Sequence, residues 1–228
     1  MAGVEKQTTI GQFQSFIREV YGVPNDRHFS LWDMLSNMER FTMRGLKGIR
    51  KNDYNKAKYN LLVSLSWFAS ILNRLHIDLE DAAWKRFPYM CSYCASCPCE
   101  CREKGIKSRQ DTKLDEGKRP ASLEGFQDMF EKIYPSEQRT TEHAGIHLAE
   151  ELGEFSEAVL GYMGEHREET FQELMLEAAD IFSCMIGVFN SMKTSLSEEL
   201  SMMFHNGCHV CHKSPCCCGF QSILAFDS

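Results

Sequence analysis

The chain has 228 residues, of which 43% are hydrophobic, and a formal net charge of −7, so it is long enough for one large or two small domains with a real core. It has no run of about 18 apolar residues and no basic-then-apolar start, which argues against a membrane span and a signal peptide. We therefore expect a cytoplasmic protein whose eleven cysteines stay reduced and serve as metal ligands rather than disulfides.

The charge is unevenly distributed along the chain. Residues 1–89 carry 13 Lys and Arg against 9 Asp and Glu, a balance of +4, whereas residues 120–204 carry 4 against 17, a balance of −13. So acidic a segment does not suit a nucleic-acid surface, but it suits a site that collects divalent cations. The basic half could pack against the acidic half or face an anionic ligand.

The hydrophobic pattern predicts helices along most of the chain. In residues 60–75 and again in 146–160, apolar residues recur at steps of three and four, and residues 177–192 are apolar on most sides. Alternating strand patterns are lacking. The fold class we expect is all-α, with three or four helices in each half followed by a cysteine-rich tail.

Four segments recur in the same order, which indicates a tandem duplication. "FQSFIREVYG" (13–22) matches "FQDMFEKIYP" (126–135), and "LSNMERFTMRGL" (35–46) matches "AEELGEFSEAVL" (149–160). Residues 60–75 match 177–192, and the tails 91–101 and 208–218 share C-x2-C-x3-P-C-x-C. The pattern predicts a first repeat over 1–101, a polar linker over 102–122 and a second repeat over 123–228, paired as a pseudo-dimeric bundle.

Two pairs of acidic residues in the second repeat could form a metal site. Glu151 and Glu154 are three residues apart, as are Glu177 and Asp180, so each pair would share one helical face. The second pair begins a strongly apolar stretch, where an unpaired carboxylate is costly. If the two helices pack antiparallel, the four carboxylates can converge on a Mg²⁺ ion, which prefers oxygen ligands. The alternative is a solvated acidic face.

The combination "EELGE…EAAD" resembles the all-α nucleoside triphosphate pyrophosphohydrolases of the MazG-like superfamily. "HLAEELGEFSEAV" is similar to the first metal-binding helix of that family, and "LNRLHIDLEDAAWKRFP" resembles a segment that follows the second. The resemblance implies cleavage of an NTP or dNTP between its α and β phosphates. It also implies that Glu151, Glu154, Glu177 and Asp180 bind Mg²⁺, for which Mn²⁺ could substitute, and that Glu150 supports these ligands or positions the attacking water.

The first repeat departs from this pattern. Asn37, Arg40, Asn60 and Val63 stand where the second repeat has its four acidic residues, so this half should not bind the catalytic metal and could serve as a scaffold or a substrate wall. Its segment "RGLKGIRK" offers Lys47, Arg50 and Lys51 as phosphate contacts, although a solvated basic face is the simpler interpretation. Trp32 and Trp67 could stack on a base, or could be core residues.

Each tail offers four cysteines for a structural zinc ion, which thiolates bind in a tetrahedral array. The first set is Cys91, Cys94, Cys99 and Cys101, and the second set is Cys208, Cys211, Cys216 and Cys218. Cys97 and Cys217 are left over, and Cys184 is expected to be a core residue. An iron–sulfur cluster or disulfides remain alternatives.

The function we expect is that of a Mg²⁺-dependent nucleotide pyrophosphohydrolase with about two structural zinc ions. The alternative is a non-catalytic nucleotide sensor or adaptor that uses the same metal site and binds partners through its zinc knuckles. A zinc-dependent nucleic-acid-binding protein is disfavoured by the acidic second half. The duplicated chain could pair again as a homodimer.

Overall fold

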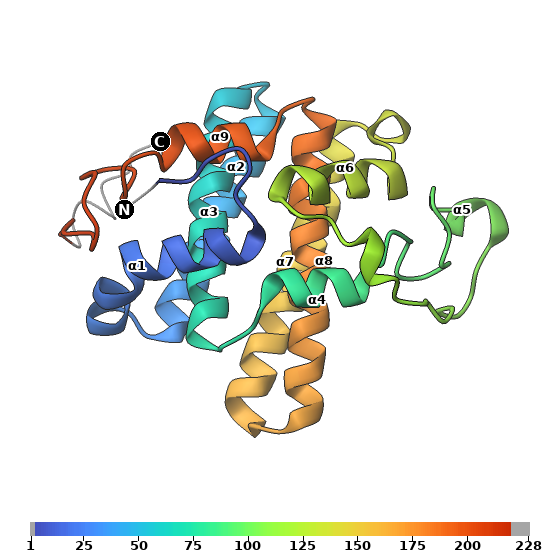
Figure 1. The fold of residues 1–228 in the computed structure, drawn as a ribbon, viewed down its shortest axis with the longest axis horizontal. Coiled ribbons are helices and arrows are strands. Elements are labelled where there is room, and N and C mark those ends of the chain that lie inside the picture. Colours follow the sequence, from blue (N-terminus) through green and yellow to red (C-terminus); the bar gives the residue numbers. More distant parts are fainter. Residues whose placement is uncertain (1–2, 220–228) are drawn as a thin grey trace. The chain divides into compact units, whose positions relative to one another are not determined.

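The computed structural model describes residues 3–219, and within them all regular secondary structure is helical (Figure 1). The all-α class predicted from the periodicity of the sequence is therefore confirmed. Before the linker lie α1 (Ile10–His28), α2 (Leu31–Arg50), α3 (Tyr54–Arg74) and α4 (Leu79–Arg86). The linker region contains α5 (Cys101–Lys104) and a short 3₁₀ turn, η1 (Glu116–Lys118). After it come α6 (Leu123–Ile133), η2 (Ser136–Gln138), α7 (Thr141–Glu165), α8 (Glu168–Ser191) and α9 (Leu196–Met203).

The helices begin where short polar side chains can cap them. Thr9 and Gln12 form a reciprocal capping box at the start of α1, and Ser30 and Asp33 do the same for α2. Ser122 and Thr140 accept backbone N–H groups at the starts of α6 and α7. Four helices followed by a cysteine loop thus occur twice in the described chain.

The chain divides into two compact units that do not coincide with the two sequence repeats. One unit contains the described residues up to Ile77 together with those from Ser197 onward, and the other contains Asp78–Leu196. The first unit therefore combines α1, α2 and α3 with α9 and the second cysteine loop. The second unit combines α6, α7 and α8 with α4 and the first cysteine loop. The boundaries expected at 101 and 123 separate the two sequence repeats. In the structure, the last helix and the cysteine loop of each repeat belong to the compact unit that holds the other repeat's first three helices.

In the first unit, small residues let α2 and α3 approach closely. A Cβ added to Gly48 would lie 2.7 Å from the backbone nitrogen of Ala57, and one added to Gly45 would lie 2.7 Å from Leu61 Cγ. The hydroxyls of Thr42 and Ser64 meet at 2.6 Å in the buried contact. The glycines of the "RGLKG" segment therefore pack the two helices together.

We expect Gly48→Ala to destabilise the protein by about 1–3 kcal/mol, because backbone at Ala57 cannot move aside as a side chain could. Gly161→Ala is the matched control, since a Cβ at this position of α7 meets nothing within 4 Å. That change should instead stabilise the protein by up to about 1 kcal/mol through helix propensity. Urea unfolding of both variants measures the difference, and equal effects would contradict the close approach of α2 and α3.

The second cysteine loop forms a hydrogen bond with a backbone carbonyl of α1. This carbonyl lacks the usual helical hydrogen bond from the residue four positions later, because that residue is a proline. Pro24 lies inside α1 and has no N–H to donate to the carbonyl of Val20, four residues earlier. The N–H of Cys216 takes that place and donates to Val20 O at 2.7 Å. The sequence of α1 therefore creates an acceptor for the loop.

In the second unit, the first cysteine loop is held in the same way by the end of α6. The N–H of Cys99 donates to Ile133 O at 2.8 Å. The α7–α8 hairpin forms the long part of this unit, and α4 packs across α8 (Figure 1). Phe87, directly after α4, meets the ring of Phe130 edge-on, with centroids 5.2 Å apart. The indole N–H of the fully buried Trp84 donates to Glu116, so the linker is anchored on α4.

By length and composition, α8 is the one described helix that could cross a membrane. The sequence itself has no run of about 18 apolar residues, and α8 indeed contains the charged residues Glu177 and Asp180. A core helix of a soluble protein passes the same test, and 56% of the apolar window of α8 is buried. The property is thus weak evidence for a membrane span.

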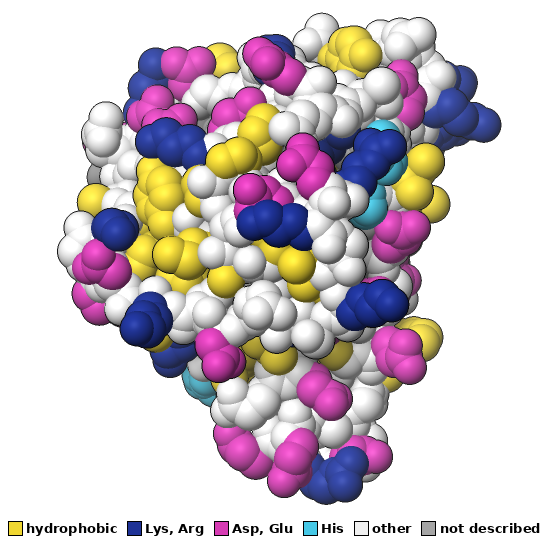
Figure 2. Space-filling model, turned by 90° about the vertical axis from the view of Figure 1, so that its right-hand side faces the viewer, with side chains coloured by type: hydrophobic (Ala, Val, Ile, Leu, Met, Phe, Trp, Pro, Cys, Tyr) yellow, Lys and Arg dark blue, Asp and Glu magenta, His cyan; other side chains and the backbone are white. Residues whose placement is uncertain are grey.

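Charges of both signs are interspersed on the molecular face shown in Figure 2. The tip of the α7–α8 hairpin, at the lower end of that view, carries mostly acidic side chains. Glu165, Glu168 and Glu169 belong to this tip, where Arg167 pairs with Glu165. Surface pairs of this kind contribute little stability.

Candidate functional site

Three carboxylates converge where α7 and α8 pack against each other. Glu151 lies on α7, and Glu177 and Asp180 lie on one face of α8, three residues apart. One oxygen from each of the three lies within 4.8 Å of the others. Three of the four acidic residues singled out in the sequence therefore form a compact cluster.

The cluster makes ionisation of its glutamates unfavourable. Burial, together with the neighbouring charges of Asp180 and Glu154, raises the pKa of Glu151 to about 7. The same causes raise the pKa of Glu177 to about 7. The Oε2 atoms of both glutamates are buried and have no hydrogen-bond partner in the described part of the chain. Buried carboxylate oxygens are costly unless a donor or a cation compensates them.

Asp180 is compensated by Arg86, at the end of α4. Nε of Arg86 donates to Oδ1 of Asp180 at 3.0 Å, and Nη2 pairs with Oδ2. The side chains are only 8% and 14% exposed. The paired geometry fixes the orientation of the Asp180 carboxylate. No local pattern in the sequence links Arg86 to Asp180, because the two residues lie 94 positions apart.

The other two acidic candidates lie outside the cluster. Glu154 is exposed and affects the glutamates only through its charge. Glu150 is also exposed, and its Oε2 lies 3.2 Å from Nδ1 of His147. Nε2 of His147 lies in turn 3.2 Å from Nε2 of His143. Glu150 is therefore engaged with the histidine pair on its own helix.

A second arginine near the cluster was also missed in the sequence. The guanidinium of Arg139 lies over the ring of Tyr134, 5.6 Å from its centroid. One of its terminal nitrogens lies 3.9 Å from the place that a Cβ of Gly187 would occupy. Its positive charge lowers the pKa of Cys184, whereas the charges of Glu151 and Asp180 raise it. Arg139 pairs with no carboxylate of the described residues, and it is one of only four cations in residues 120–204.

The four corresponding residues of the first repeat are engaged within their own unit. The side-chain amides of Asn37 and Asn60 donate to the carbonyls of Asp33 and Lys56, each at 2.8 Å. The guanidinium of Arg40 lies over the ring of Phe41, 4.8 Å from its centroid. Of the four, Asn60 and Val63 are buried in their unit.

The proposed substrate contacts of the first repeat lie on its surface. Lys47, Arg50 and Lys51 are exposed at the end of α2, where positive charge suits the helix dipole. Trp32 is 56% exposed, whereas Trp67 is buried against Phe29. These residues belong to the unit of α1, α2 and α3, and their role toward a substrate stays a prediction.

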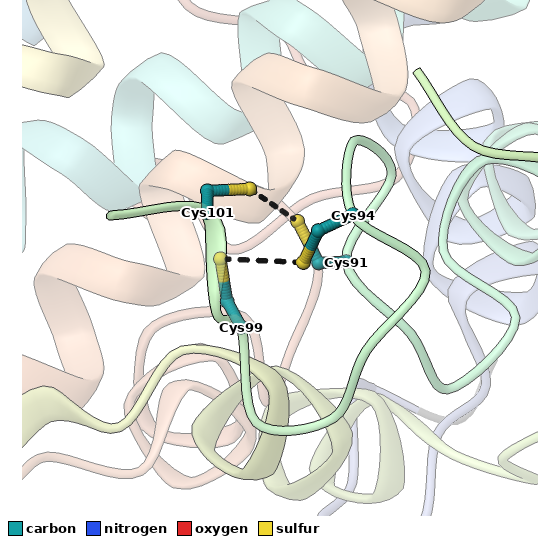
Figure 3. Close-up of side chains that lie close together, drawn as sticks. All are labelled: Cys91, Cys94, Cys99 and Cys101. Carbon is teal, nitrogen blue, oxygen red and sulfur yellow. Dashed lines mark hydrogen bonds between the residues drawn. The ribbon is translucent and has the colours of Figure 1, made fainter. Parts of the chain in front are cut away.

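The first cysteine loop brings four sulfurs together, as Figure 3 shows. Sγ of Cys91 lies 3.6 Å from that of Cys101, and Sγ of Cys94 lies 3.9 Å from that of Cys99. Four thiolates at about 2.3 Å from one zinc ion would be about 3.8 Å apart. The spacing thus fits a tetrahedral site, and the predicted ligand set is the one that converges.

The second loop repeats this arrangement. Sγ of Cys208 lies 3.8 Å from that of Cys218, and Sγ of Cys211 lies 3.9 Å from that of Cys216. The backbone N–H of Val210 donates to Cys208, as that of Tyr93 does to Cys91 in the first loop. None of the eleven cysteines forms a disulfide. Both loops can therefore hold a metal ion.

Backbone donors prepare some of these thiols for ionisation. Burial opposes ionisation of Cys94, but hydrogen bonds from the N–H groups of Glu100 and Ser96 and from neighbouring thiols together lower its pKa to about 6. A hydrogen bond from Cys216 is the main cause that lowers the pKa of Cys208 to about 4. The three thiols outside the two ligand sets differ from them: Cys97 and Cys217 are exposed, and burial raises the pKa of Cys184 to about 12.

Comparisons of the chain with family models, with curated proteins and with solved structures found no match. The chemistry of the site must therefore be inferred from its own geometry. In one compact unit the chain offers a carboxylate cluster in which Glu151 and Glu177 lack a partner, with Arg86 and Arg139 in the same unit. Each of the two units also carries one four-cysteine loop.

Proposed function

We propose that the protein is a Mg²⁺-dependent nucleoside triphosphate pyrophosphohydrolase, which converts an NTP or dNTP and water into a monophosphate and pyrophosphate. The observation that carries the proposal is the pair of buried Oε2 atoms of Glu151 and Glu177, which lie beside Asp180 and find no hydrogen-bond partner in the part of the chain that the structure describes. A protein gains nothing for its fold from such a cluster, since it destabilises the structure unless a cation is bound.

The donor set favours a hard cation. Only carboxylate oxygens converge at this point, which suits Mg²⁺ or Mn²⁺ and not zinc. Glu151, Glu177 and Asp180 would hold the ion, with Arg86 keeping Asp180 in its orientation. When bound, such an ion neutralises phosphate charge and activates water.

The phosphate groups of the substrate are negatively charged and need a positively charged side chain at this site. Arg139 pairs with no carboxylate within residues 3–219, so its guanidinium is available to a phosphate group. Gly187 leaves open the space beside its terminal nitrogen. The "EELGE…EAAD" pattern, with its resemblance to MazG-like enzymes, supports the same reaction class.

The two cysteine loops have a structural role in this proposal. Each would hold one zinc ion and is tied by a backbone hydrogen bond to the end region of a helix, at Ile133 or at Val20. Tyr134, which supports Arg139, follows Ile133 directly. The first zinc loop would therefore also stabilise the phosphate-binding side of the site.

The proposal is tested by measuring pyrophosphate release from a panel of NTPs and dNTPs with Mg²⁺. Arg139→Gln should raise KM about tenfold or more, because the variant loses a charged contact to phosphate. Arg167→Gln is the matched control, since Arg167 is an exposed cation of the same unit that pairs only with Glu165. It should leave kcat and KM unchanged.

Two results would count against the assignment. If the wild-type protein turns over no nucleotide but binds one with Mg²⁺, it is a sensor or adaptor and not an enzyme. If it neither binds nor cleaves any member of the panel, the carboxylate cluster does not serve nucleotides. Equal kinetics for Arg139→Gln and wild type would remove Arg139 from the substrate site.

A further inference from the structure

A partly open cavity of about 190 Å³ lies in the unit of α1, α2 and α3, where Cys208, Cys216 and Cys218 of the second cysteine loop form part of its wall. Aromatic side chains form much of its lining: Tyr21, Phe29, Phe41 and Trp67. Trp67 and Phe29 meet edge to face, with centroids 5.2 Å apart. An apolar cavity of about 150 Å³ is large enough to bind benzene, so this one can accept a planar ligand of one or two rings.

Most polar groups around the cavity are committed elsewhere. The hydroxyl of Ser66 donates to Val63 O at 2.7 Å, and that of Ser70 donates to Ser66 O at 2.8 Å. The hydroxyl of Tyr21 lies 3.0 Å from Nδ1 of His209. These contacts leave few groups that could recognise a ligand.

Asn25 is an exception among the buried lining residues. It lines the cavity from α1, is only 6% exposed, and its carboxamide has no hydrogen-bond partner among the described residues. The carboxamide of Asn25 offers two donors and one acceptor that no other described residue uses. It would gain a bidentate pair from a ligand whose edge presents a donor next to an acceptor.

The position of this cavity in the first repeat corresponds to the position of the carboxylate cluster in the second repeat. Val63, which lines it, stands 117 residues before Asp180, a member of the carboxylate cluster. Trp67 stands 117 residues before Cys184. The same place in the two repeats therefore holds acidic groups in one copy and an aromatic cavity in the other.

We propose that this cavity binds a planar nitrogen heterocycle, held between its aromatic side chains and hydrogen-bonded edge-on by Asn25. The aromatic lining supplies apolar area and stacking partners. The amide selects rings that carry an adjacent donor and acceptor over hydrocarbon rings of the same size. This site is distinct from the proposed catalytic site, because it lies in the other compact unit and includes none of the carboxylates or arginines assigned to that site.

Calorimetric titration of the full-length, zinc-loaded protein tests the proposal with two probes of similar size. Adenine presents a donor beside an acceptor, whereas indole has a donor only. We expect about one adenine to bind per chain. Asn25→Leu should weaken adenine binding about 10- to 100-fold and leave indole binding within about threefold of wild type. Ser70→Phe, which fills the cavity, should remove both, with circular dichroism used to check that it folds.

Asp180→Asn is the control for binding at the carboxylate cluster and should leave adenine affinity unchanged. Adenine binding that survives Ser70→Phe in a folded protein, or that is lost in Asp180→Asn, would place the ligand elsewhere and overturn the proposal. So would an absence of adenine binding to wild type, or an equal effect of Asn25→Leu on both probes.

Discussion

Glu151→Gln should abolish pyrophosphate release while making the metal-free protein more stable at pH 8. The variant removes one of three converging carboxylates, so the cation loses a ligand and kcat should fall on the order of 100-fold or more. Without metal, the same change removes repulsion between buried charges. Opposite effects on activity and stability are the signature of a functional site, because a residue kept for folding would lower both.

The stability gain should depend on pH in a defined direction. Burial raises the pKa of Glu151 and of Glu177 from 4.5 to about 7 in the folded protein. A carboxyl group whose folded pKa is raised favours folding below its unfolded pKa, and this contribution is lost as the pH rises through the folded value. The melting temperature of Glu151→Gln minus that of wild type should therefore increase between pH 4.5 and pH 8. Saturating Mg²⁺ should reverse the difference at pH 8, since it stabilises only the wild type.

Glu157→Gln is the matched control. It removes an exposed carboxylate from the same helix without touching the cluster. Its activity and its melting temperature should follow those of wild type at every pH. If Glu151→Gln instead melts below wild type at pH 8 without metal, the cluster is not under electrostatic strain, and its assignment to a cation fails.

The sequence allowed the helices and the carboxylate cluster to be predicted because both depend on local spacing. Residues three apart share a helical face, so Glu177 and Asp180 had to lie together once α8 formed. The convergence with Glu151 needed only that α7 and α8 pack as neighbours, which a short connection favours. Glu154, although correctly spaced from Glu151, faces solvent, because helical spacing alone cannot say which of several adjacent faces is buried.

Contacts that join distant parts of the chain could not be predicted in this way. Arg86 meets Asp180 only because α4 packs on α8 and not on α3, and no local pattern encodes that choice. Arg139 lies in an irregular segment between η2 and α7, where periodicity gives no signal. The only feature of the sequence that could have drawn attention to Arg139 is that residues 120–204 contain just four Lys and Arg residues. The cysteine ligands were found because the repeated C-x2-C-x3-P-C-x-C spacing is itself local.

Cys91→Ser should remove one zinc ion per chain and destabilise the protein strongly, whereas Cys97→Ser should do neither. Cys91 is buried with its Sγ 3.6 Å from that of Cys101, whereas Cys97 is an exposed thiol of the same loop. Loss of a structural zinc removes folding free energy directly. A loss of several kcal/mol would lower the melting temperature by roughly 10 °C in a chain of this size. Metal analysis by mass spectrometry and calorimetry measure the two effects.

The second loop provides an independent repetition of the same comparison. Cys208→Ser should again lower the zinc content from about two to about one per chain, and Cys217→Ser should leave it unchanged. Because the two loops belong to different compact units, the losses should be additive in a double variant of Cys91 and Cys208. Visible absorbance with iron in the purified protein would favour a cluster instead. A zinc content that Cys91→Ser does not change would show that its sulfur is no ligand, although it lies among three others at tetrahedral spacing.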